Sequence, residues 1–227
     1  MVHENRDPVK QAILLANNIR NDNRIFASMI KMYWMLALRL TVLYEKYIPQ
    51  VLNNTNNNIL NFSCGNRYYD NAVNSDLFMP HRFIKGKRRP DLYWSGLNNI
   101  KHLQGFFDGI ICEHVIEHIF PDEVMCIFSN FLNVLNIGGV LVVSFPDIRR
   151  VLCSNSCQGF SSSIVAANSV IYRYGHRFMY DKEIVCALLR SVGFKDVNVV
   201  AFNDVSLKQY IYFGREVESS YVIASKI

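Results

Sequence analysis

A short run of small residues interrupts an apolar segment in the first half of the chain. The apolar run Ile59–Phe62 ends at the turn-forming residues Ser63–Asn66, and a second apolar segment then leads to Asp76. Glycine in such a bend lets the backbone approach a ligand closely, because Gly65 has no Cβ. A carboxylate at the next strand end can accept hydrogen bonds from both hydroxyls of a ribose. The pattern predicts a nucleotide-type site, although an ordinary strand–turn–strand unit looks the same.

Histidines and carboxylates gather farther along the chain, at Glu113, His114, Glu117 and His118. The last three match the H-x-x-E-H spacing of inverted zinc peptidases. On a helix the two histidines would share a face and could bind Zn²⁺, with Glu117 as general base. However, the motif directly follows a predicted strand, Pro121 comes three residues later, and no downstream acidic helix offers a third ligand. We therefore favour a hydrogen-bonded turn or an acceptor-binding loop without a metal.

Three polar residues in the second half of the chain are further candidates. His176 could act as a general base, because a neutral imidazole accepts protons near pH 7, and a capping or core-edge histidine is the alternative. Asp147 could line a pocket after a predicted strand, or it could be a turn residue after Pro146. Together with His118 and Tyr180, Asp147 is predicted to contact the substrate.

Composition limits the class of protein. The chain has 227 residues, half of them hydrophobic, and a net charge of +5, which fits one α/β domain with a sizeable core. This charge is too weakly clustered to predict nucleic-acid binding. The basic run Lys85–Arg89 is either a solvated face or a patch for an anionic acceptor such as a phosphorylated sugar or lipid carrier. Six cysteines without a C-x-x-C pair, and no signal peptide, predict reduced thiols in the cytoplasm.

The N-terminal part is predicted to be a helical extension, residues 1–50, that precedes the main domain, residues 51–227. Apolar residues recur at helical spacing over residues 25–48. Lys31 and Arg39 interrupt this segment, so no run reaches the roughly 18 apolar residues that a membrane span needs. We expect the helix to pack on the domain or to form a homodimer contact, and binding along a membrane surface is the less favoured alternative.

The elements that position the candidate residues follow from hydrophobic spacing. A buried strand is predicted over residues 106–112, and Pro121 begins an amphipathic helix that Gly138 and Gly139 are expected to end. A strand is predicted over residues 140–145. This strand–helix–strand unit implies parallel strands joined by a right-handed crossover.

The C-terminal part has clear helix boundaries. Asp181 is a predicted N-cap, and Gly193 a predicted helix stop. The segments Val197–Phe202 and Tyr221–Ser225 read as strands, and about 18 residues without a strong helix separate them. We therefore expect an antiparallel pair.

Five segments in this order resemble the class I S-adenosylmethionine-dependent methyltransferase family, in the branch near the type 11 group. The resemblance extends from about Ile59 to the C-terminus, and it rests on Asn61–Gly65, Val73–Asp76, Phe107–His118, Leu135–Leu141, and His176–Asp181 with Gly193-Phe194. It implies an α/β fold with a Rossmann-like, seven-stranded mixed sheet, the last strand antiparallel, flanked by helices. Ligands of open α/β sheets bind at the carboxyl ends of the strands.

The resemblance also implies S-adenosylmethionine as cofactor, with binding residues at Ser63, Cys64, Gly65, Asn66, Asp76, Leu77, Gly96, Leu97, Glu113 and His114. Gly65 would approach the methionine part, Asp76 the ribose and Leu77 the adenine. Three features depart from the family pattern. Trp94-Ser95-Gly96 stands where the family usually has an acidic residue after the third strand. Ser63 stands where the family often has glycine, and the eleven positions from Gly65 to Asp76 are too few for a full helix and its turns.

The resulting hypothesis is methyl transfer to an oxygen or nitrogen atom of a small molecule or a sugar or glycan acceptor. Such an enzyme works mainly by holding the reacting atoms in line and close together. Where the acceptor must lose a proton, His114 or His176 would be the base. The alternatives are a non-catalytic binding protein of the same fold and, less favoured, a zinc hydrolase acting through His114 and His118.

Overall fold

The computed structural model describes residues 9, 13, 36, 40, 58–77, 88–153, 167, 170–171, 176–207, 209 and 218–227. Almost all of the predicted N-terminal extension and its dimer contact therefore lie outside the described residues, as do residues 85–87 of the basic run. The division at residue 50 stays a prediction. Among the described residues, no helix has both the length and the apolar character needed to cross a bilayer.

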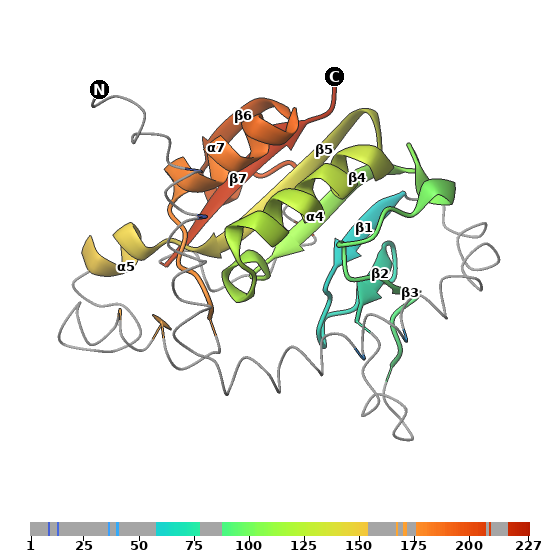
Figure 1. Cartoon of the computed structure of the whole chain (residues 1–227), viewed down its shortest axis with the longest axis horizontal. Helices are drawn as coiled ribbons and strands as arrows, with labels where there is room; N and C mark the ends of the chain where they lie inside the picture. Colours follow the sequence, from blue (N-terminus) through green and yellow to red (C-terminus); the bar gives the residue numbers. More distant parts are fainter. Residues whose placement is uncertain are drawn as a thin grey trace.

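A single seven-stranded sheet forms the centre of the described chain, in the order β3-β2-β1-β4-β5-β7-β6 (Figure 1). The strands from β3 to β5 run parallel, whereas β7 is antiparallel to both β5 and β6. This confirms the predicted mixed sheet and the antiparallel C-terminal pair. The strand bounds are Ile59–Phe62 (β1), Val73–Asp76 (β2), Leu92–Tyr93 (β3), Phe107–Glu113 (β4), Leu135–Pro146 (β5), Lys195–Val200 (β6) and Ser219–Ser225 (β7).

Strand register brings the candidate residues to one edge of the sheet. Phe62, at the end of β1, pairs with Cys112 near the end of β4, and Cys112 pairs with Val143 of β5. The residues that follow these strands therefore meet at their shared carboxyl edge, where ligands of open α/β sheets bind. We call this the carboxyl edge.

Helix α4 (Pro121–Val134) joins β4 to β5, as predicted. Proline suits its first position because no intrahelical partner exists there for an N–H. Its buried face follows the predicted three- and four-residue spacing at Val124, Ile127, Phe128 and Phe131. Phe131 stacks edge-on against Phe62 at a ring distance of 4.8 Å, which ties the helix to β1.

The prediction that a glycine pair ends this helix is wrong. Leu135 already has extended backbone angles and pairs with Phe107 of β4, so β5 begins there. The pairing register then shifts between Phe107 and Gly109, and Gly138 adopts a φ of 81°. A Cβ on Gly139 would lie only 2.9 Å from the carbonyl oxygen of Asn136. The two glycines thus serve an irregularity inside the strand rather than a helix cap.

Helix α7 (Lys182–Val192) confirms both predicted boundaries. The Asp181 side chain accepts a 2.8 Å hydrogen bond from the Ile184 N–H, and Gly193 ends the helix with a φ of 110°. The remaining described helices are short: η4 (Lys101–Leu103), η5 (Ile116–His118), α5 (Ile148–Cys153) and η7 (Phe202–Asp204).

Alternate residues of the central strands enter different cores. Ile110 and Leu141 pack with the side chains of α4 and α7, which lie together on one face of the sheet (Figure 1). Their neighbours Ile111 and Val142 point to the other face and pack with Tyr221 and residues near η7. A strand that is buried on both faces in this way is typical of a parallel sheet covered on two sides.

Candidate functional site

The turn after β1 is held by the candidate carboxylate at the end of β2. The Gly65 N–H donates to Oδ2 of Asp76 at 3.0 Å, and the Leu77 N–H donates to Oδ1 at 2.7 Å. The Cys64 N–H donates to the Ser75 carbonyl at 2.8 Å. Ser63 and Gly65 both have left-handed backbone angles, with φ of 55° and 57°. The structure thus brings the predicted turn and the predicted carboxylate into direct contact.

No helix forms between β1 and β2, as the short spacing predicts. An asparagine network supports the connection instead. Asn61 donates to Oδ1 of Asn74 at 3.0 Å and to the Arg67 carbonyl at 2.8 Å. The Asn74 amide in turn donates to Asp91 at 2.9 Å and to the carbonyl of Tyr69. Sequence reasoning missed this network, although two asparagines at equivalent positions of adjacent predicted strands were a usable signal.

Arg67 is a second residue that the sequence reasoning missed. Its guanidinium lies 2.9 Å from Oε1 of Glu113, so it links the β1 turn to the end of β4 across 46 residues. About a third of the Arg67 side chain is exposed, whereas Glu113 is largely covered. Glu113 therefore lies at the carboxyl edge as predicted, with an arginine as its partner.

Gly96 and Leu97, the predicted cofactor contacts after β3, both lie against the main core. A Cβ on Gly96 would lie 2.9 Å from the ring of Phe62 and 3.1 Å from Ile127, so this glycine allows close packing against the core. Its carbonyl accepts a 2.7 Å hydrogen bond from Asn130 of α4. Leu97 is half-buried and packs on the same core. These contacts pack Gly96 tightly against the core, and its contact with a cofactor stays a prediction.

The segment after β4 does not form the helix that the zinc-peptidase motif requires. Ile116–His118 is a single 3₁₀ turn, and His114 has a left-handed φ of 51°. The Nε2 atom of His114 lies 2.8 Å from the Ser219 hydroxyl, and its Nδ1 lies 3.3 Å from Oε1 of Glu117. His114 and His118 therefore do not share a helical face.

Glu117 instead lies among three histidines. Its side chain is 1% exposed, and its Oε1 lies 4.0 Å from Nε2 of His176. The rings of His118 and His176 meet edge-on at 4.9 Å. Two backbone bonds join the segments, because the Glu117 carbonyl accepts from the N–H groups of Arg177 (2.8 Å) and Phe178 (3.2 Å). We call Glu117, His118 and His176, with His114 beside them, the His–Glu cluster.

The charges in the His–Glu cluster follow from burial and proximity. Burial acts to raise the pKa of Glu117, but the imidazoles of His114 and His118 outweigh it and hold that pKa below its ordinary value. Burial lowers the pKa of His176, although Glu117 partly offsets this. At neutral pH the cluster therefore contains a carboxylate and a neutral His176.

Two predicted substrate residues, Asp147 and Tyr180, are buried and hydrogen-bonded within the protein. Asp147 is 1% exposed, and its carboxylate accepts from the Arg149 N–H at 2.9 Å and from the Ser220 hydroxyl at 2.7 Å. Tyr180 is fully buried, and its hydroxyl donates to the Ile119 carbonyl at 2.8 Å. Their polar groups hold the ends of β5 and of the loop after β4 in place, and substrate contact stays a prediction for both residues. His118 is partly exposed and belongs to the His–Glu cluster.

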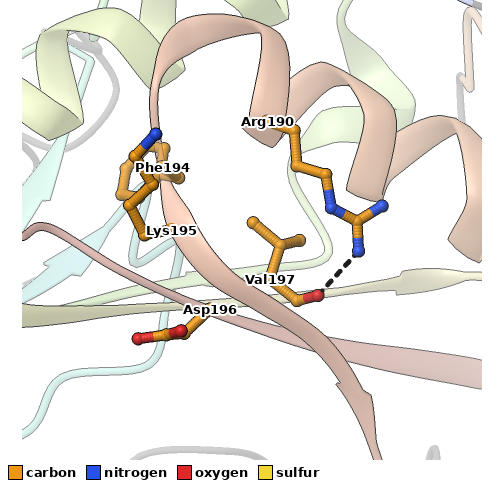
Figure 2. A pocket seen from close by; sticks show the side chains of 5 residues that line it. All are labelled: Arg190, Phe194, Lys195, Asp196 and Val197. Atoms are coloured by element: carbon orange, nitrogen blue, oxygen red, sulfur yellow. Dashed lines mark hydrogen bonds between the residues drawn. The ribbon is translucent and has the colours of Figure 1, made fainter.

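A cavity of about 320 Å³ lies away from these residues (Figure 2). It is lined by Arg190, Phe194, Lys195, Asp196 and Val197, where α7 leads into β6. Arg190 donates to the Val197 carbonyl at 2.8 Å, so its guanidinium is already engaged. Lys195 pairs with Ser225, which also pairs with Val140 near the amino end of β5. This cavity therefore lies at the edge of the sheet opposite the carboxyl edge.

Comparisons with known proteins give the fold a context. No family model matches the chain, and no curated protein matches it. A solved SAM-dependent methyltransferase from Archaeoglobus fulgidus is similar with a TM-score of 0.51 and 16% identity, over 84% of this chain and 94% of that one. A possible histamine N-methyltransferase from Thermotoga maritima has a TM-score of 0.47 and 19% identity, over 89% and 98% of the two chains.

The likeness to the Archaeoglobus structure covers most of both chains. It agrees with the strand order and with the antiparallel β7, which lies between β5 and β6. The chain therefore has the fold of the class I S-adenosylmethionine-dependent methyltransferases.

Proposed function

We propose that this chain is an S-adenosylmethionine-dependent methyltransferase that acts on a small molecule or on a sugar or glycan acceptor. The observation that carries the proposal is the contact between the Gly65 turn and the Asp76 carboxylate, at the carboxyl edge of a sheet with the methyltransferase strand order. When bound, S-adenosylmethionine supplies an electrophilic methyl group on a sulfonium.

The residues at this turn fit such a cofactor. Among the described residues, no atom lies within 4 Å of the position that a Cβ on Gly65 would occupy, so the backbone is open to a ligand. The two oxygens of an ionised Asp76 offer about four acceptor sites, and the Gly65 and Leu77 N–H groups use one on each oxygen. We expect ribose hydroxyls to donate hydrogen bonds to this carboxylate.

The carboxyl edge also offers groups for the acceptor's proton. Both ring nitrogens of His114 already contact protein groups, Ser219 and Glu117. His176 is the better suited of the two predicted bases, because its lowered pKa keeps its imidazole neutral at pH 7. Its contact with Glu117 would stabilise the imidazolium that forms on proton uptake.

Calorimetric titration with S-adenosylhomocysteine tests the cofactor part of the proposal. We expect saturable binding with one molecule per chain and micromolar affinity, which corresponds to about −8 kcal/mol. An Asp70→Asn variant is a suitable control, because Asp70 is an exposed carboxylate that pairs with Arg88 near the same turn. Absence of heat at high micromolar ligand, with the fold intact by circular dichroism, would refute a cofactor site.

A non-catalytic protein of the same fold is the second candidate. The observation that favours it is the β1–β2 connection, in which turns replace a helix and so provide fewer N–H groups pointing at a ligand. Mass spectrometry of small molecules that co-purify with the protein separates the two functions. Recovery of the methyl donor or its product together with an acceptor supports the enzymatic function. A sample that contains no nucleoside ligand supports the non-catalytic function.

A further inference from the structure

We propose that Glu117, His118 and His176 form a binding site for one divalent transition-metal ion, for which Zn²⁺ is the test ion. One ligand atom from each of these residues lies within 4.8 Å of the others. The set contains one carboxylate and two imidazoles, which is a ligand set that catalytic zinc sites and mononuclear iron sites use. This differs from the H-x-x-E-H hypothesis, because His176 replaces His114 and no helix is required.

An independent observation points to a ligand at this position. Glu117 is 1% exposed, and among the described residues no group makes a well-directed hydrogen bond to either of its carboxylate oxygens. Buried carboxylates are normally satisfied by hydrogen bonds, by charge pairs or by metal ions. The nearest charge contact, His114 Nδ1 at 3.3 Å, leaves acceptor capacity on both oxygens. A cation between Glu117, His118 and His176 would supply the interactions that the carboxylate oxygens lack.

The backbone around the cluster is suited to hold such ligands. The Glu117 carbonyl accepts hydrogen bonds from Arg177 and Phe178, so the turn carrying two ligands is fixed to the segment carrying the third. Outside the ligand set, His114 contacts the Glu117 carboxylate and is itself held by Ser219. Contacts of this kind fix the orientation of metal ligands in known sites.

The distances require only a small adjustment. In a tetrahedral zinc site with bonds of about 2.0–2.1 Å, ligand atoms lie roughly 3.4 Å apart. The carboxylate of Glu117 and Nε2 of His176 are 4.0 Å apart, and the three ligand atoms are all within 4.8 Å. Side-chain rotations that close the triangle by about an ångström would therefore complete the site, and three protein ligands leave a coordination position open.

This site would change the part that His176 plays in the proposed function. With an ion bound, the imidazole nitrogen is a ligand and is no longer a base. Metal binding itself does not depend on methyl transfer, so it can be measured in the absence of any nucleoside. Failure of the metal site and failure of the cofactor site are therefore separate results.

Zinc titration of the untagged, chelator-treated full chain tests the proposal. The background should carry Cys126→Ser and Cys153→Ser, because exposed thiols bind zinc on their own. We expect one Zn²⁺ per chain, and an affinity at least tenfold weaker in His118→Gln and in His176→Gln. His102→Gln is the matched control, because His102 is an exposed histidine in η4, at the opposite edge of the sheet.

Two results would overturn the site. One is the absence of saturable zinc binding at high micromolar concentration. The other is zinc binding that His118→Gln and His176→Gln leave unchanged, which would place the ion elsewhere. Thermal melts without metal establish that each variant is folded. Glu117→Gln is a third, near-isosteric variant, and it should also weaken zinc binding at least tenfold.

Discussion

Asp76 and Glu117 are both buried carboxylates at the carboxyl edge, and their surroundings differ. Each oxygen of Asp76 accepts a backbone N–H, from Gly65 and from Leu77. Neither oxygen of Glu117 accepts a well-directed hydrogen bond from the described residues, and its neighbours are imidazoles. The first carboxylate shapes a backbone turn, whereas the second retains binding capacity. Burial alone therefore does not distinguish a carboxylate that supports the fold from one available to a ligand.

The largest expected effect on stability comes from neutralising Asp76, and the same change at Glu117 is the comparison. In Asp76→Asn the new amide group would face a backbone N–H, so one charged hydrogen bond is lost and one donor is unsatisfied. We expect a loss of roughly 2–3 kcal/mol in the free energy of unfolding. Glu117→Gln should change it by less than about 1 kcal/mol in metal-free protein, because neither carboxylate oxygen accepts from the described residues a well-directed hydrogen bond that the substitution would remove.

Urea denaturation of both variants at pH 7 measures this difference. Equal losses in the two variants would contradict the contrast between the two carboxylates. A smaller loss in Asp76→Asn than in Glu117→Gln would reverse it, and would assign the structural role to the His–Glu cluster.

A smaller effect is expected at the glycine of the β1 turn. Gly65 has a φ of 57° and Gly138 has a φ of 81°, and a Cβ at either position would meet no described atom within 4 Å. Alanine should therefore cost about 1–2 kcal/mol of stability at both positions, from left-handed backbone strain alone. Only Gly65→Ala should also weaken S-adenosylhomocysteine binding, because Gly138 lies at the opposite edge. Calorimetry and urea denaturation measure the two quantities, and equal ligand affinities would argue against a ligand at the turn.

The smallest effect on stability is expected for Arg67→Gln. The Arg67–Glu113 pair is partly exposed, so its loss should cost at most about 1 kcal/mol. Because the pair joins the β1 turn to the end of β4, we expect the variant to weaken S-adenosylhomocysteine binding severalfold. Titration calorimetry at two salt concentrations measures this, and an unchanged affinity would limit Arg67 to a surface role.

Local patterns in the sequence predicted much of the fold. The first residue of α4, the cap and stop of α7, and the buried central strands all depend on residues that are close in sequence. The glycine pair near residue 138 was misassigned because a helix stop and a strand irregularity both use glycine. Pairing with Phe107 decided between them, and that contact is not visible in a local window.

The candidate site was predicted less completely, because its contacts are long-range. The Gly65 turn and Asp76 were found, since a short connection joins them. Arg67 contacts Glu113, which lies 46 residues later in the sequence. His176 contacts Glu117 only because the segment before α7 packs against the loop after β4. Asp147 was placed correctly at a strand end, but its burial and its bond to Ser220 follow from β7, which comes far later in the chain.

The placement of β7 has a consequence for the order of assembly. This strand is translated after β6, yet it lies between β5 and β6 and bonds to both. Its first residues, Ser219 and Ser220, also contact His114 and Asp147. A nascent chain that has reached residue 217 therefore contains every candidate residue. It still lacks β7, the strand that orients His114 and Asp147. Binding competence should arise only when this last strand inserts, as a late event in the maturation of the protein.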